Sequence, residues 1–239
     1  MEVRILSDAR AIGEAVAALL CETIRSKPDC VLGLATGATP VPTYDALAAA
    51  YAAGTVSFRQ VRTFNLDEYC ALPKTHKNSF YSFMQEHLFR RVDLDPANID
   101  FLDGNADPEA ESARYSAAIA AAGGIDVQLL GIGRNGHIAF NEPADAFTQE
   151  SFCVALTEST IAANSIYFDD VPMPRKAITM GVGLILRAKK LILIATGESK
   201  AEAVKAMVQG PVTPRCPASA LQTHPDALVF LDPAAARLL

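Results

Sequence analysis

The chain lacks the sequence signals of a membrane protein and of a nucleic-acid-binding protein. No stretch of roughly 18 or more uninterrupted apolar residues occurs, so we expect no transmembrane helix and no membrane partner. The N-terminal segment MEVRILSDAR starts with charged residues rather than with the apolar core of a signal peptide, and we therefore expect a cytoplasmic protein. The formal net charge is -6 and no block of Lys and Arg is present, which argues against nucleic acid as a partner.

Cysteine is scarce and scattered. The five cysteines (Cys21, Cys30, Cys70, Cys153 and Cys216) form no CxxC pair, and no histidine lies at zinc-finger spacing from them. We therefore expect neither a metal site nor a redox pair, and the odd number of thiols fits a reducing compartment. Buried small side chains are the simplest interpretation of these positions. Cys70 differs from the others because it lies next to a candidate functional motif.

Apolar strand-like runs alternate with helix-like segments along the chain, and no internal repeat or long linker interrupts them. The predicted strands are 30–36, 61–66, 99–102, 125–133, 189–197 and 227–232, and the predicted helices include 40–54, 78–89, 108–124 and 199–210. This alternation implies βαβ crossovers and a largely parallel sheet. We expect an α/β fold of the doubly wound, Rossmann-like type, with helices on both faces of the sheet, in a single domain that spans residues 1–239.

The motif ATGATP at residues 35–40 follows a predicted strand and offers an anion site. A phosphate ester is well served by glycine-flanked amides, hydroxyl groups and the N-terminus of a helix, which Pro40 is expected to open. The motif is neither GxxxxGK[ST] nor GxGxxG, so neither a nucleoside triphosphate nor NAD is indicated. A tight turn without a ligand explains the motif equally well. The candidate anion-binding residues are Thr36, Gly37, Ala38 and Thr39, with Lys200 at the start of a later predicted helix.

The motif TFNLDEY at residues 63–69 ends another predicted strand with two carboxylates. If the chain stays extended there, Asp67 and Glu68 point in opposite directions, and one of them faces the crevice at the strand ends. A partly desolvated Asp67 is suited to remove a proton from a carbon next to a carbonyl group. The alternative is that the two residues only cap a helix or form a solvated turn.

The motif GIGRNGHIAFNEP at residues 131–143 places a histidine and a carboxylate on a glycine-rich loop after a buried strand. His137 and Glu142 are close enough in sequence for the carboxylate to orient the imidazole, and Asn135 can join the same network. Open α/β sheets bind their ligands where such strand ends meet. With the two motifs above, this arrangement predicts a metal-free and cofactor-free enzyme that acts on a small phosphorylated metabolite.

The motifs together resemble those of the glucosamine-6-phosphate deaminase family, aldose-ketose isomerases that convert glucosamine 6-phosphate to fructose 6-phosphate and ammonia. The resemblance is carried by ATGATP, FNLDEY, GHIAFNEP, TMGVG and PASALQTH, which are spread over nearly the whole chain. It implies that Asp67 moves a proton from C2 to C1 through an enolamine and that His137, with Glu142 and Asn135 as partners, opens the sugar ring. It also places the substrate phosphate on Thr36, Gly37, Ala38, Thr39 and Lys200.

The chain departs from the family pattern at two places. Many members carry an Arg that contacts the phosphate within ANSRFF, whereas this chain reads ANSIYF and has Ile166 there. Because an aliphatic side chain cannot replace a guanidinium, we predict either another cation near the phosphate, with Arg175 as the candidate, or an altered preference such as galactosamine 6-phosphate. The chain also lacks the basic stretch and the long C-terminal tail of the hexameric, activated members, so by resemblance we expect an unregulated monomer.

Two other interpretations remain open. The related 6-phosphogluconolactonases typically have DER where this chain has Asp67, Glu68 and Tyr69, and they lack the FNEP ending. A lactonase needs water activation rather than deprotonation of carbon. A sugar-phosphate sensor without turnover is the third candidate, but it would need a DNA-binding module and would have no use for a base and a proton shuttle.

Overall fold

The computed structural model describes the backbone of residues 1–239 and every side chain except those of residues 159, 163, 164 and 167. Its main sheet has seven strands in the order β1-β10-β9-β6-β2-β3-β5, and all paired neighbours run parallel. The strands are β1 (Glu2–Ile5), β2 (Val31–Leu34), β3 (Arg62–Asn65), β5 (Ile99–Asp100), β6 (Val127–Leu130), β9 (Lys190–Ala195) and β10 (Ala227–Leu231). The prediction of a largely parallel α/β sheet is confirmed.

Helices cover both faces of the main sheet. Along β9, Leu191 and Leu193 belong to one buried cluster, whereas Ile192 and Ile194 belong to another, as the alternation of side chains along a strand requires. The first cluster contains residues of α4 (Pro108–Ala121), α6 (Val182–Leu186) and α7 (Ala201–Gln209), and the second contains residues of α1 (Ala9–Ser26), α2 (Val41–Ala52) and α3 (Phe80–His87). The fold is therefore doubly wound, as predicted.

The strand β1 and the helix α1 precede the first predicted strand and lie outside the sequence predictions. The Asp8 side chain caps α1 by accepting a hydrogen bond from the Ala11 N–H at 2.8 Å. Gly13 lets α1 approach α2 closely, because a Cβ at this position would lie only 2.6 Å from Pro42. Among the residues that the structure describes, no helix combines the length and apolar character needed to span a bilayer.

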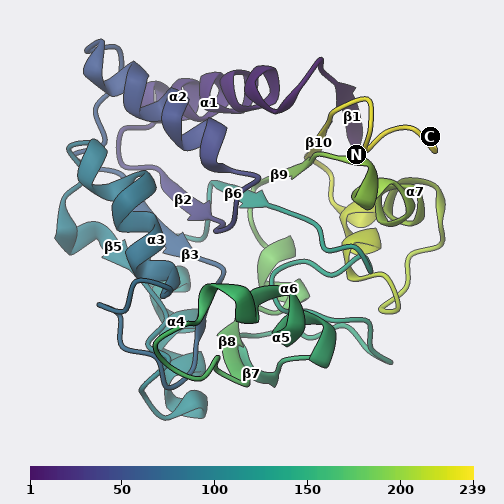
Figure 1. Cartoon of the computed structure of the whole chain (residues 1–239). Helices are drawn as coiled ribbons and strands as arrows, with labels where there is room; N and C mark the ends of the chain where they lie inside the picture. Colours follow the sequence, from purple (N-terminus) through teal and green to yellow (C-terminus); the bar gives the residue numbers. More distant parts are fainter.

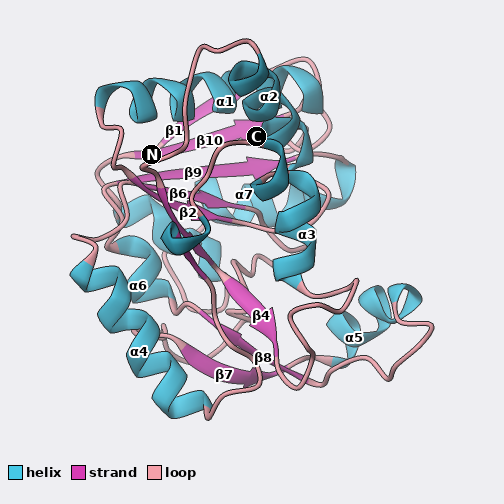
Figure 2. Ribbon diagram, turned by 90° about the vertical axis from the view of Figure 1, so that its left-hand side faces the viewer, coloured by secondary structure: helices cyan, strands magenta, loops and turns pink.

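A second, smaller sheet lies beyond the main one and was not predicted. Its strands are β4 (Asp67–Tyr69), β8 (Lys176–Thr179) and β7 (Phe152–Ala155), paired antiparallel in the order β4-β8-β7. Figures 1 and 2 show β7 and β8 at the lower end of the molecule, with α5 (Glu158–Asn164) beside them. Tyr69, Leu72, Phe140, Leu156 and Ala177 form a separate small core under this sheet.

The strand order identifies the edge of the main sheet at which a ligand would bind. From β2 the chain builds outward through β3 to β5, whereas from β6 it builds in the opposite direction through β9 to β10. The neighbours β2 and β6 therefore flank the point at which the winding reverses. In open α/β sheets the crevice at the carboxyl ends of such strands is the usual ligand site.

Candidate active site

A pocket of about 930 Å³ opens at this edge of the sheet. The loops that follow β2, β3, β6 and β9 contribute to its walls, so the motifs at residues 35–40, 63–69 and 131–143 meet around one cavity. Lys200 and Thr160, from the segments after β9 and β7, complete it. The convergence that the sequence motifs predicted is therefore present.

The loop after β2 presents Thr36, Gly37 and Thr39 to the pocket. Gly37 has a φ of 99°, in the left-handed region that glycine adopts without a steric penalty. Ala38 belongs to the same loop but is exposed and does not line the pocket. The helix α2 begins directly after Pro40, which is its N-cap, so the helix start was predicted within one residue. The N-terminus of this helix faces the cavity and favours an anion there.

Lys200 reaches the same cavity from the opposite side. It ends the short 3-10 helix Glu198–Lys200 and precedes α7, as predicted, and its Nζ donates a hydrogen bond to the Ile132 carbonyl oxygen at 2.7 Å. Burial lowers the pKa of Lys200, and the positive charge of Arg134 lowers it further. An anion placed between the two side chains would relieve this repulsion.

Asp67 lies at the junction of the two sheets. Leu66 forms the junction: its N–H donates to the Leu34 carbonyl at 3.1 Å, and its own carbonyl accepts from the Met180 N–H at 2.8 Å. Asp67 follows as the first residue of β4, lines the pocket and is only 7% exposed. Burial, together with the nearby charge of Glu68, raises the pKa of Asp67 to about 8.

Glu68 points away from the pocket, as alternation along an extended chain predicts. Its carboxylate is fully buried and accepts hydrogen bonds from the N–H groups of Tyr69, Phe80 and Tyr81 at 2.8, 3.0 and 3.0 Å. Burial raises the pKa of Glu68 to about 6, and these three hydrogen bonds oppose the rise. Glu68 therefore anchors the start of α3 to β4, which fixes the orientation of Asp67 at the pocket wall. Glu68 thus binds the first N–H groups of α3, and its neighbour Asp67 lines the pocket.

His137 sits on a tightly folded loop after β6. The Gly133 N–H donates to the His137 carbonyl at 2.9 Å, and the Gly136 N–H donates to the Gly133 carbonyl at 3.0 Å. A Cβ on Gly133 would lie 2.2 to 2.4 Å from three atoms of the His137 ring, so the imidazole packs directly against this glycine. Ala139 has a φ of 50°, a left-handed conformation that a non-glycine residue adopts only where its surroundings enforce it.

A network of polar side chains supports the imidazole from behind. The distance from His137 Nδ1 to Glu142 Oε1 is 3.5 Å, long for a hydrogen bond but within the range of an ion pair. Asn135 donates from Nδ2 to Glu142 Oε2 at 2.6 Å, and Thr160 donates from its hydroxyl to Oε1 at 3.0 Å. Burial raises the pKa of Glu142, but the interactions with His137, Asn135 and Thr160 outweigh it and leave the pKa below its usual value. Glu142 therefore remains an anion that orients the histidine.

Three aromatic rings form an apolar wall beside Asp67. Tyr69 lies 4.6 Å from Phe80 and 6.0 Å from Phe140, measured between ring centroids, and all three rings line the pocket. They exclude water from the carboxyl group and so account for its raised pKa. The same three rings belong to the core of the small sheet or pack against it. Packing alone accounts for apolar residues at these positions, so the sequence did not identify them as part of a site.

Comparison with known proteins places the chain in a family. Residues 7–230 match the family of glucosamine-6-phosphate isomerases and 6-phosphogluconolactonases. The chain belongs to this family. Glucosamine-6-phosphate deaminases from Cellvibrio japonicus and Rhodopirellula baltica are 52% and 49% identical over 241 aligned positions, covering 100% of this chain and 92% and 96% of those proteins.

Solved structures agree with this assignment. A monomeric glucosamine-6-phosphate deaminase superposes with a TM-score of 0.96 and 42% identity, and the alignment covers 100% of both chains. A 6-phosphogluconolactonase from Thermotoga maritima has a TM-score of 0.79 with 17% identity over 97% of this chain and 99% of that one. At that identity the lactonase shows the shared fold alone.

Arg175, the candidate for a cation in place of the family's phosphate-contacting Arg, does not lie at the pocket. Arg175 is 70% exposed and forms an ion pair with Glu158, and it does not line the pocket. Ile166 is 77% exposed and does not line the pocket either. Besides Lys200, the cation that lines the pocket among the described residues is Arg134, between two glycines of the loop that carries His137. The sequence signal that could have identified Arg134 as a pocket residue is its position within GIGRNGH, three residues before His137.

Cys70 does not line the pocket, although it follows Tyr69 directly. Its Sγ lies 3.9 Å from the Sγ of Cys153, and burial raises the pKa of the Cys70 thiol to about 12. Among the side chains that the structure describes, no three His, Cys, Asp or Glu residues are grouped as metal ligands. The polar groups that line the pocket are hydroxyl, amide, imidazole, cationic and carboxyl groups.

Proposed function

We propose that the chain is a deaminating isomerase that converts glucosamine 6-phosphate and water to fructose 6-phosphate and ammonia. The observation that carries the proposal is the presence of a buried carboxyl group, Asp67, and an imidazole, His137, in one pocket with an anion-binding loop. Relatives that share about half of their residues with the whole chain are glucosamine-6-phosphate deaminases. The positions of these groups in the pocket support the role that we propose for each of them.

The substrate phosphate binds to the loop at residues 36–39 and to Lys200. Thr36 and Thr39 supply hydroxyl groups, and the N-terminus of α2 supplies a favourable field. Binding of the phosphate holds the sugar with its C1 and C2 atoms over Asp67, which converts a random encounter into a positioned reaction.

His137 opens the pyranose ring. It transfers a proton between the C1 hydroxyl group and the ring oxygen, which yields the open-chain aldehyde. Glu142 faces Nδ1, so the nitrogen that exchanges protons with the sugar is Nε2. Asn135 and Thr160 hold Glu142 in place and thereby fix the orientation of the ring.

Asp67 then moves a proton from C2 to C1. The carboxylate removes the C2 proton while the aldehyde oxygen O1 takes up a proton from the substrate ammonium group, which gives an enolamine. Asp67 then returns its proton to C1, which leaves a protonated imine at C2. Water adds to this carbon, and ammonia departs with the C2–N bond to give the ketose. A raised pKa suits a group that must both accept and return a proton, and the positive charge of the substrate amine favours the ionised carboxylate once the substrate is bound.

A coupled assay for ammonia and fructose 6-phosphate tests the proposal. Wild-type protein is expected to release both products from glucosamine 6-phosphate, and Asp67→Asn is expected to bind the sugar phosphate without turnover. Galactosamine 6-phosphate, run in parallel, decides the preferred epimer, and preferential turnover of it would replace the substrate proposed here. Hydrolysis of 6-phosphogluconolactone without ammonia release from either amino sugar would overturn the deaminase proposal.

We also propose that residues 1–239 act as one catalytic domain, as a monomer and in the cytoplasm. The structural relative that covers the full chain at 42% identity is described as monomeric, which supports the first two points. Light scattering coupled to size-exclusion chromatography measures the mass in solution, and a dimer mass at working concentration would contradict the proposal.

A further inference from the structure

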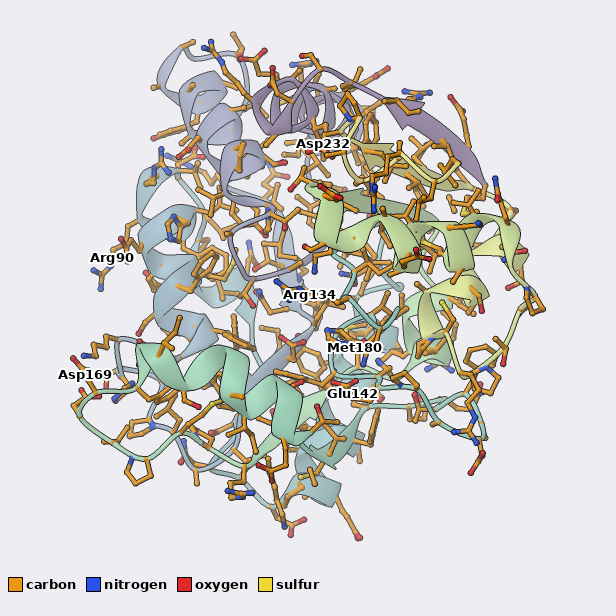
Figure 3. The ribbon with its side chains drawn as sticks, turned by 45° about the vertical axis from the view of Figure 1, so that its right-hand side comes forward. Arg90, Arg134, Glu142, Asp169, Met180 and Asp232 are labelled. Atoms are coloured by element: carbon orange, nitrogen blue, oxygen red, sulfur yellow. The ribbon has the colours of Figure 1, made fainter. Side chains whose placement is uncertain are left out.

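The pocket has one polar group whose purpose the reaction above does not explain. Arg134 lines the pocket with an exposed side chain, and among the described residues it forms no hydrogen bond or ion pair. Figure 3 shows it near the centre of the molecule, whereas Arg90 and Asp169 lie toward the left-hand edge. An arginine directed at a cavity without a protein partner is available to a ligand.

The charges around the cavity match a dianion. Lys200 and Arg134 are the cations that line it, and Asp67 is the one carboxyl group that lines it, among the residues described. Since burial raises the pKa of Asp67 to about 8, this group carries little negative charge at neutral pH. Glu142 is outside the lining and is engaged by His137, Asn135 and Thr160. The pocket therefore presents about two positive charges, and a phosphate monoester carries nearly two negative ones.

The two cations come from separate loops. Lys200 follows β9 and is held by the Ile132 carbonyl, while Arg134 lies two residues after Ile132 on the loop that follows β6. Burial lowers the pKa of Lys200, and the positive charge of Arg134 lowers it further. The folded protein retains this unfavourable pair at the mouth of a pocket, and an anion bound between the side chains converts repulsion into attraction for both.

We propose that Arg134 binds the phosphate group of the sugar substrate together with Lys200, and so takes the place of the arginine that is absent at Ile166. The inference rests on the proposed function, because it concerns the same phosphate. A guanidinium offers paired N–H donors that match phosphate oxygens. Arg134 lies three residues before His137 on the same loop. This loop would therefore carry both the residue that opens the sugar ring and a residue that holds the phosphate. The phosphate contact would not depend on the segment around Ile166.

The test compares Arg134→Gln and Arg134→Lys with Arg90→Gln, a matched control on the exposed outer surface (Figure 3). Two quantities are measured: KM and kcat for glucosamine 6-phosphate, and the Kd of inorganic phosphate by calorimetry. Arg134→Gln is expected to raise both KM and the phosphate Kd about 10- to 100-fold, as loss of a charged hydrogen-bond partner does, with kcat changed less than about threefold. Arg134→Lys is expected to be intermediate, and Arg90→Gln to equal wild type.

Phosphate titration needs no turnover, so the two proposals fail separately. If wild type deaminates the sugar but Arg134→Gln leaves KM and the phosphate Kd within about twofold of wild type, the assignment of Arg134 is overturned and the reaction stands. If wild type releases no ammonia while Arg134→Gln still weakens phosphate binding about tenfold, the anion site stands and the proposed reaction fails. Because Arg134 is exposed, its replacement is expected to leave the urea midpoint of unfolding close to that of wild type.

Discussion

Replacing Asp67 with Asn is expected to stabilise the fold while it abolishes catalysis, and the gain is expected to depend on pH. In the unfolded chain the carboxyl group has a pKa near 3.8, and in the pocket burial and Glu68 raise it to about 8. Between these pH values the folded state holds a proton that the unfolded state has lost. Wild type therefore loses stability as the pH rises through this window, and the loss is complete above about pH 8.

The magnitude follows from the width of the window. Each pH unit is worth about 1.4 kcal/mol, so the upper limit for Asp67 is roughly 6 kcal/mol at pH 8 and above. Relaxation of the pocket and entry of water on ionisation reduce this figure, and we expect Asp67→Asn to gain about 2 to 4 kcal/mol over wild type there. Near pH 4 the two proteins are expected to differ by less than about 1 kcal/mol, because the folded carboxyl group is uncharged and the unfolded one has lost only part of its proton.

Urea unfolding at about pH 4.5, 6 and 8 measures the difference, provided that the slope m is the same for both proteins. Asp29→Asn, on an exposed residue, serves as the control for loss of a carboxylate. A gain for Asp67→Asn that is equal at all three pH values would refute the argument, because it would mean that the carboxyl group does not retain its proton in the fold. A loss of stability at about pH 8 would refute it equally.

Two further substitutions test the support of the imidazole. Gly133→Ala is expected to lower kcat at least about tenfold with the fold retained, because the new Cβ would lie 2.2 Å from the His137 ring. The control is Gly131→Ala, whose Cβ meets no atom within 4 Å, and its loss of kcat is expected to be smaller. Equal kcat values in the two variants would contradict this packing. Thr160→Val keeps the shape of the side chain but removes the hydroxyl that donates a hydrogen bond to Glu142 at 3.0 Å. We expect this change to lower kcat/KM about 3- to 10-fold, and we expect Thr160→Ser, which keeps the hydroxyl, to have nearly the wild-type value. Loss of activity in Thr160→Ser but not in Thr160→Val would show that the methyl group, not the hydrogen bond, matters.

The sequence was informative where a long buried strand fixes the position of the residues directly after it. Continuous apolar runs located β2, β6 and β9, and the polar residues at their carboxyl ends, such as Thr36 and Lys200, therefore had to meet at one edge. The alternation of an extended chain correctly predicted that one of Asp67 and Glu68 faces the pocket and that the other does not.

The small sheet was missed because its strands pair antiparallel with segments that are distant in sequence. β4 has three residues, and its pairing with β8 joins Asp67 to Thr179, a contact that no local pattern encodes. The position of Arg175 was not predicted for the same reason. Arg175 was a candidate for a cation near the phosphate, but the residue lies just before β8 and its side chain turns to solvent and Glu158. The direction of a side chain depends on tertiary pairing, which one sequence does not specify.

The two backbone hydrogen bonds of Leu66 bear on how the two sheets move relative to each other. Through its own N–H and carbonyl this residue is tied to Leu34 on the main sheet and to Met180 beside the small one, so a single peptide segment couples two bodies with separate cores. A sugar phosphate held by the loop at residues 36–39 and by Asp67 would span the same joint and restrain it. Amide exchange at Met180 is thus a natural reporter of occupancy, slowing as the ligand saturates the protein.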